Sequence, residues 1–191
     1  MMNQKISAWF FKISNGKITL IALLFFIVFS ILFLPGQSSL TESYSQGMGS
    51  PDTSLFYTPA NLYQMAEKYG EAGRSAYVRA RYTFDLAFPI VYTFFLATSL
   101  SWFGTRVLSE KNEFRSVNLI PFYAMLFDFF ENICTALVFI RYPGTSSVLA
   151  SLAPFFTLVK WIYVSSAFVF LFIFVIWYLV KQISSKRKER K

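Results

Sequence analysis

The residues best suited to chemistry lie inside an apolar stretch, where Asp128, Glu131 and Asn132 interrupt a run rich in phenylalanine. In a helix, spacings of three and four residues place all three side chains on one face. Each charge at the centre of a membrane costs about 2.5–3.5 kcal/mol, so both carboxyls are expected to need a proton, a cation or water. Such a face suits the binding of a cation or polar headgroup. Alternatively, its members hydrogen-bond across helices and only fix their packing.

A second group of candidates begins at Asp85. Pro89 and Tyr92 follow four and seven residues later, so all three are expected on one helix face, as one wall of an outward-facing vestibule. Alternatively, Asp85 only stabilises the start of a helix, where the helix dipole favours an acid and where Arg79 and Arg81 are within reach.

The position of Lys160 depends on where the last apolar helix begins. If the helix enters near Val148, Lys160 is deep and needs a carboxylate. The favoured start is near Pro154, which places Lys160 at the depth of Glu131, where it is expected to pair with Glu131 or Asp128. If the membrane core begins at Trp161, Lys160 extends to the outer surface instead. The distances from Lys160 to the two acids decide between these alternatives.

Composition restricts what these residues can do. The 191-residue chain has no histidine and a single cysteine, Cys134, which excludes Ser-His-Asp and Cys-His catalysis and redox disulfides. We expect neither a metal nor a cofactor. If the protein is an enzyme, its catalytic residues are expected to be Asp128 and Glu131, a carboxyl pair capable of general acid–base chemistry. The expected ligand-binding residues are Asp85, Tyr92, Asp128, Glu131, Asn132 and Lys160.

The elements that carry these residues are four long apolar runs. Hydrophobic residues make up 55% of the chain and charged residues 15%, against about 25% charged residues in a typical soluble domain. A membrane core of about 30 Å needs roughly 20 helical residues. We therefore predict an all-α polytopic membrane protein, a single domain over 1–191 with four transmembrane helices in a bundle. The predicted spans are 18–36, 82–103, 117–140 and 153–180.

The first run could instead be a cleaved signal peptide. The sequence Leu34-Pro35-Gly36 offers no small-residue cleavage site, so an uncleaved anchor is expected.

The placement of Lys and Arg predicts the orientation. The N-terminal segment, the loop after the second span and the tail 181–191 carry 12 of the 18 basic residues, whereas the opposite side carries five. Because cytoplasmic loops are enriched in Lys and Arg, both termini are expected in the cytoplasm, with the protein in the cell (inner) membrane. The tail is expected to contact anionic lipid, and no nucleic acid is expected as a partner.

The outer loop, 37–81, divides into two parts. Its first part, 37–54, is rich in Ser, Gly and Thr and is predicted to be flexible. Thr58-Pro59 then predicts the start of a short amphipathic helix that lies on the outer membrane surface and stops at Gly70. A second short helix from Gly73 is expected to lead into the second span.

The chain resembles an uncharacterised family of prokaryotic four-span integral membrane proteins of unknown function. The resemblance covers roughly 56–167 and implies a membrane fold without implying an activity. The residues that carry it are Tyr57-Thr58-Pro59, Tyr69-Gly70, Gly73-Arg74, Asp85 to Pro89, Asp128 with Glu131-Asn132, and Lys160-Trp161.

Several functions remain open. The first is a carboxylate-lined intramembrane cavity that binds a lipid, amphiphile or cation. A second is an accessory subunit whose polar face meets a membrane-protein partner or another copy of the chain. A third is an intramembrane lipid-modifying enzyme of the isomerase type. An ion-coupled transporter is less favoured, because four spans without an internal repeat would need oligomerisation to form a pathway. We rank binding or accessory roles above catalysis.

Overall fold

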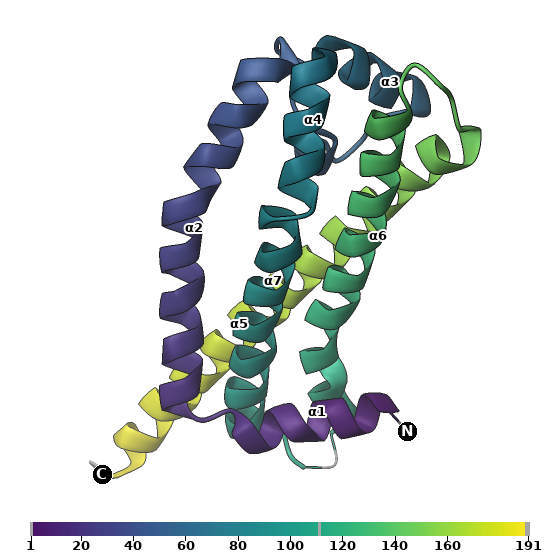
Figure 1. Ribbon diagram of the computed structural model, residues 1–191. Coiled ribbons are helices and arrows are strands. Elements are labelled where there is room, and N and C mark those ends of the chain that lie inside the picture. The colour runs from purple at the N-terminus through teal and green to yellow at the C-terminus, as the bar shows by residue number, and fades with distance from the viewer. Residues whose placement is uncertain (1, 111, 190–191) are drawn as a thin grey trace.

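The computed structural model describes residues 2–110 and 112–189, which form helices joined by short connections and contain no strand (Figure 1). The α-helices are α1 (Met2–Ile13), α2 (Gly16–Ser45), α3 (Pro59–Lys68), α4 (Gly70–Arg81), α5 (Phe84–Val107), α6 (Ile120–Arg141) and α7 (Ser147–Glu189). Two 3₁₀ helices, η1 (Pro51–Thr53) and η2 (Glu113–Leu119), lie in the connections.

Four helical stretches are long and apolar enough to cross a membrane: Gly16–Ser45, Gly70–Val107, Glu113–Arg141 and Ser147–Arg187. The predicted all-helical, multi-pass character of the chain is therefore confirmed. The second stretch consists of α4 and α5, which are separated by a break at Tyr82 and Thr83. This break places the first turn of α5 inside the protein, where its side chains can meet those of neighbouring helices.

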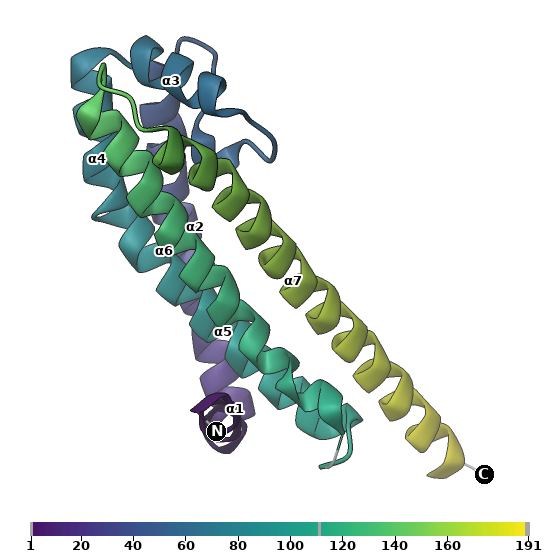
Figure 2. The ribbon, with the colours of Figure 1, turned by 90° about the vertical axis from the view of Figure 1, so that its right-hand side faces the viewer.

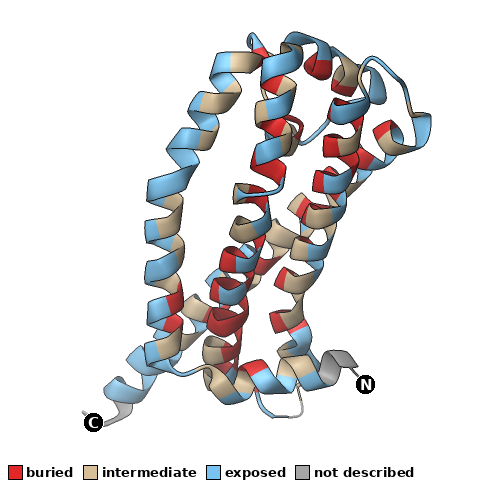
Figure 3. Cartoon of the chain, viewed as in Figure 1, coloured by how far each residue is buried: buried red, intermediate tan, exposed pale blue. Residues whose placement is uncertain are grey.

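Helix α5 is central, because it packs against α2, α6 and α7, while α6 makes its most extensive contacts with α7. Helix α7 crosses behind α5 in the view of Figure 1, and it diverges from α6 toward its C-terminal end (Figure 2). Buried residues concentrate on α4, α5 and α6, whereas most of α2 is exposed (Figure 3). Because the exposed side chains of α2 and α7 are largely apolar, these two helices present surfaces suited to lipid.

The first long helix continues beyond its predicted end. Residues 37–45, predicted to be flexible, form the last turns of α2, which passes through Pro35 and ends at Ser45. Packing accounts for the difference: a Cβ on Gly73 of α4 would lie 2.8 Å from the Cβ of Tyr44. This close approach, which glycine permits, fixes the end of α2 against α4 despite its weak helix propensity.

Helix α3 begins as predicted. Thr58 accepts a hydrogen bond from the Asn61 amide at 3.2 Å, the Asn61 side chain accepts one from the Thr58 amide at 2.9 Å, and Pro59 is the first helical residue. Tyr69 separates α3 from α4, whose first residue, Gly70, has φ +63°. The buried face of α3 packs against α6 and α7. Its location on a membrane surface stays a prediction.

Helix α1 lies across the opposite end of the helices, and the N- and C-termini are both at that end (Figure 1). It packs against α5 and η2. We refer to the two ends of the molecule as the α1 end and the α3 end. The candidate site lies toward the α3 end.

Candidate functional site

Six ionisable side chains from five elements converge inside the protein. They lie on η1, α4, α5, α6 and α7 and are joined by a continuous set of ion pairs. We call them the charge cluster: Asp52, Arg81, Asp85, Asp128, Glu131 and Lys160.

Lys160 is the centre of the charge cluster. Its Nζ lies 2.9 Å from Oδ1 of Asp52 and 3.9 Å from Oδ1 of Asp128, and it forms an ion pair with Glu131. The expected pairing with Glu131 is therefore confirmed. The alternative, in which Lys160 extends to the outer surface, is wrong: the residue is 3% exposed. Because α7 begins at Ser147, ahead of Pro154, Lys160 lies well inside the helix.

Arg81 is the second cation. As the last residue of α4, it reaches across the break to Asp85 in the first turn of α5, with 2.8 Å between Nη2 and Oδ2. Its Nη1 lies 3.3 Å from Oδ1 of Asp52 and donates to Oδ1 of Asn132 at 3.2 Å. Its proximity to Asp85 follows from the sequence spacing, whereas its other two contacts depend on the tertiary fold.

The remaining predicted residues complete one network. Tyr92 donates to Oδ2 of Asp128 at 3.1 Å. Asn132 donates to Oδ1 of Asp128 and to the backbone oxygen of Asp85, both at 3.1 Å. All six residues expected to bind a ligand thus belong to one continuous network of hydrogen bonds and ion pairs.

The sequence does not predict that Asp52 belongs to the charge cluster. It belongs to η1, in a segment predicted to be flexible, yet Trp161 Nε1 donates to its backbone oxygen at 3.1 Å. Burial opposes ionisation of the Asp52 carboxyl, but the positive charges of Lys160 and Arg81 outweigh this effect and hold its pKa below the usual range. The local sequence contains a turn signal at Pro51 but nothing that indicates insertion between helices.

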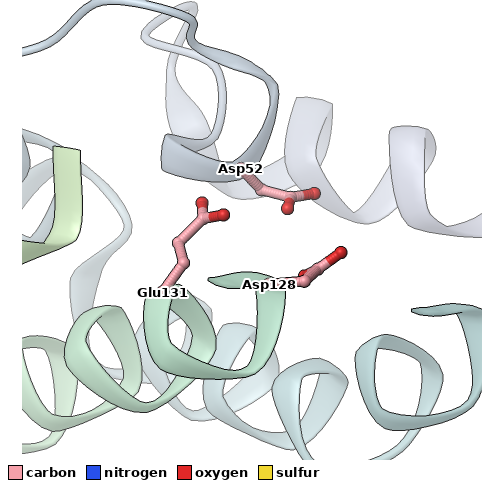
Figure 4. Close-up of side chains that lie close together, drawn as sticks. All are labelled: Asp52, Asp128 and Glu131. Carbon is pink, nitrogen blue, oxygen red and sulfur yellow. The ribbon is translucent and has the colours of Figure 1, made fainter. Parts of the chain in front are cut away.

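The carboxyl groups of Asp52, Asp128 and Glu131 lie close together (Figure 4), each with an oxygen within 4.8 Å of the others. Such a trio is able to hold a metal ion. The ammonium of Lys160 contacts all three carboxylates, so a side chain of the protein itself supplies positive charge where a bound cation would otherwise lie.

The charge cluster contains four carboxyls and two cations, a formal charge of −2 when all six groups are ionised. Buried charge of this kind is costly unless protons or further cations neutralise it. Oε1 of Glu131 has no hydrogen-bond partner within the described part of the chain, whereas Oε2 of Glu131 faces Lys160 and Oδ2 of Asp85 faces Arg81. The cluster therefore has unused acceptor capacity.

Two cavities adjoin the charge cluster. The first, which we call the apolar cavity, measures about 240 Å³ and lies between α2, α5 and α7. Its polar lining consists of Asp52, Thr53, Asp85, Tyr92, Asp128 and Lys160. The remainder is apolar or aromatic, contributed by Phe26, Leu34, Phe84, Phe88, Pro89, Trp161, Val164 and Phe168.

The second, the polar cavity, measures about 210 Å³ and continues toward the end of α2. It shares Asp52 and Asp85 with the apolar cavity and adds polar side chains of α2, among them Gln37, Thr41 and Glu42.

Comparison with protein-family models, curated proteins and solved structures gives no match. The resemblance to prokaryotic four-span membrane proteins stays a prediction, and functional inference depends on the site itself.

Proposed function

We propose that the protein is a four-helix membrane bundle that binds an amphiphile in the apolar cavity, with the polar group of the ligand against the charge cluster. The observation that carries the proposal is the lining of this cavity. Three carboxylates lie beside aromatic and aliphatic walls, an arrangement that matches a molecule with one polar and one apolar part. In water the apolar part of such a ligand would be exposed. A membrane, by contrast, dissolves the whole ligand and can deliver it to the cavity directly.

The proposal includes an orientation. Both termini lie at the α1 end, as an even number of membrane crossings requires. With the basic N-terminal segment and tail in the cytoplasm, the polar cavity faces the outer side of the cell membrane. A ligand then has access from the outer side through the polar cavity.

Binding is better supported than isomerase-type catalysis. A general acid and a general base must both reach the reacting atoms. Asp128 lines the apolar cavity, whereas Glu131 is fully buried, forms an ion pair with Lys160 and does not line it. The carboxyl pair expected from the sequence therefore offers a ligand one acid rather than two.

Filling the apolar cavity tests the proposal. Val164 of α7 lines it, whereas Val169 of the same helix is 56% exposed and does not. Native mass spectrometry of protein released gently from membranes should detect a bound amphiphile on the wild type and on V169W. V164W should reduce its occupancy about tenfold, because an indole occupies the space that the ligand needs.

Equal occupancy in all three proteins would contradict binding in this cavity. Loss of a copurifying membrane protein, rather than of a small amphiphile, would favour an accessory-subunit role.

A further inference from the structure

Positive charge at the apolar cavity is already matched by acids of the protein. The ammonium of Lys160 contacts Asp52, Asp128 and Glu131, so its three N–H groups have three carboxylates to serve. Both Nη atoms of Arg81 are engaged as well, and Arg81 does not line the apolar cavity. An anionic headgroup in the apolar cavity would therefore have to displace a carboxylate of the protein to reach the ammonium of Lys160. Nε of Arg81, the one buried cationic N–H without a hydrogen-bond partner among the described residues, belongs to a residue that does not line this cavity.

Negative charge, by contrast, is in surplus. Asp85 is 5% exposed, lines both cavities and is paired through Oδ2 with the guanidinium of Arg81 at 2.8 Å. When all six groups are ionised, the charge cluster has a formal charge of −2, and this net negative charge attracts an additional cation. A carboxylate accepts several hydrogen bonds, and a charged N–H donor stabilises a buried carboxylate more than a neutral donor does.

The aromatic lining has the same preference. Phe84 and Phe88 border the apolar cavity. Trp161 borders it as well, and the ammonium of Lys160 already lies 5.5 Å from the centre of its ring. The face of an aromatic ring is electrostatically negative and attracts a cation, most strongly where water is excluded.

The approach from the α3 end is also acidic. The polar cavity is lined by Glu42, Asp52 and Asp85, against the single cation Arg81. A cation that entered there would meet carboxylates at the rim and again where the two cavities adjoin.

We propose that the amphiphile is cationic: a protonated amine, or a related N–H cation, whose charged group lies between Asp85 and Asp128 and whose apolar part lies against Val164 and the aromatic walls. This inference rests on the proposed function and specifies its ligand class. The apolar cavity has the volume of about eight water molecules, so it takes a small headgroup and the first part of the attached chain.

Three probes of equal chain length test the sign of the charge: dodecylammonium, dodecanol and dodecanoate, each added at pH 7 to protein in a neutral detergent. Native mass spectrometry should give an affinity for dodecylammonium at least about tenfold higher than for the other two. D85N should remove most of this preference. Glu67, which is exposed on α3, provides the control, and E67Q should retain it.

D52N serves as a second variant, because Asp52 is another carboxylate in the cavity lining, and it should also weaken the preference. Equal binding of dodecylammonium and dodecanol, both reduced by V164W, would overturn the cationic class and leave the proposed function standing. Tighter binding of dodecanoate would also overturn the cationic class. Failure of all three probes to bind in a manner sensitive to V164W would remove the proposed function itself.

Discussion

At the α1 end the buried polar side chains are neutral, whereas the buried charged side chains of the described residues lie toward the α3 end. Asn118 of η2 is 1% exposed and donates to Ser101 Oγ at 2.9 Å and to the backbone oxygen of Ser7 at 3.2 Å. Its own oxygen accepts from Ser7 Oγ at 2.8 Å. We call these three residues the Asn118 knot. Both amide hydrogens and the amide oxygen are used, which is what a group with only a packing role requires.

The charge cluster differs in charge and in completeness. It carries a formal net charge, and Oε1 of the buried Glu131 has no hydrogen-bond partner within the described part of the chain, so its members are not fully satisfied by one another. Burial of polar groups alone therefore does not distinguish a binding site from a packing contact. The distinction lies in whether every buried donor and acceptor of the network has a hydrogen-bond partner within the protein.

Lys160→Met is expected to have the largest effect on this comparison. It leaves Asp52, Asp128 and Glu131 close together without their shared cation, and loss of one partner of a buried ion pair typically costs about 3–5 kcal/mol. Equilibrium unfolding in mixed micelles should show a decrease of this size in the free energy of unfolding. Lys68 is exposed on α3, and K68M should change the free energy by less than about 0.5 kcal/mol.

The double variant K160M/E131Q should recover part of the loss, because it removes a buried carboxylate together with its partner. If K160M is as stable as the wild type, the ammonium is not the counter-ion that the three acids need, and the contrast between the two ends disappears.

Much of the charge cluster can be predicted from the sequence, because helical periodicity is local. Spacings within one run place Asp128, Glu131 and Asn132 on one face, and charge at that depth requires a partner, for which Lys160 is the candidate on a neighbouring run. Asp52 could not be found in this way. Its position depends on contacts distant in sequence, such as Trp161 with its backbone oxygen and Tyr57 with Thr157 at 3.0 Å.

Helix lengths show the same division between local and distant causes. The capping box at Thr58 is local, and it correctly predicts where α3 begins. The continuation of α2 through 37–45 depends on the packing of Tyr44 against Gly73 of α4, which no local pattern encodes. Composition indicated a flexible segment, and tertiary packing overrode it.

Asn118→Ala should have an intermediate effect and tests the neutral end. It removes a complete set of hydrogen bonds and leaves the hydroxyl of Ser101 without its donor, a change expected to cost about 1–3 kcal/mol. S101A removes one of these bonds and should cost less. The preference for dodecylammonium should be unchanged in both variants. A change in ligand preference would mean that the Asn118 knot is coupled to the charge cluster, so that the two ends of the molecule do not act independently.

The smallest expected effect is that of Asp52→Asn, and its pH dependence distinguishes the two ends. Because the folded state lowers the pKa of Asp52, ionised Asp52 stabilises the protein above its ordinary pKa of about 4, and this contribution is lost as the pH falls toward the folded-state pKa. The side chain is 27% exposed, so screening limits the expected difference between wild type and D52N to about 1 kcal/mol at pH 7. Unfolding measured from pH 7 to pH 3 should show this difference shrinking below about pH 4, whereas the difference between wild type and N118A should stay constant. A D52N difference that is constant or increases with acid would mean that Asp52 is not held ionised by Lys160 and Arg81, and the α3 end would then be as insensitive to pH as the Asn118 knot.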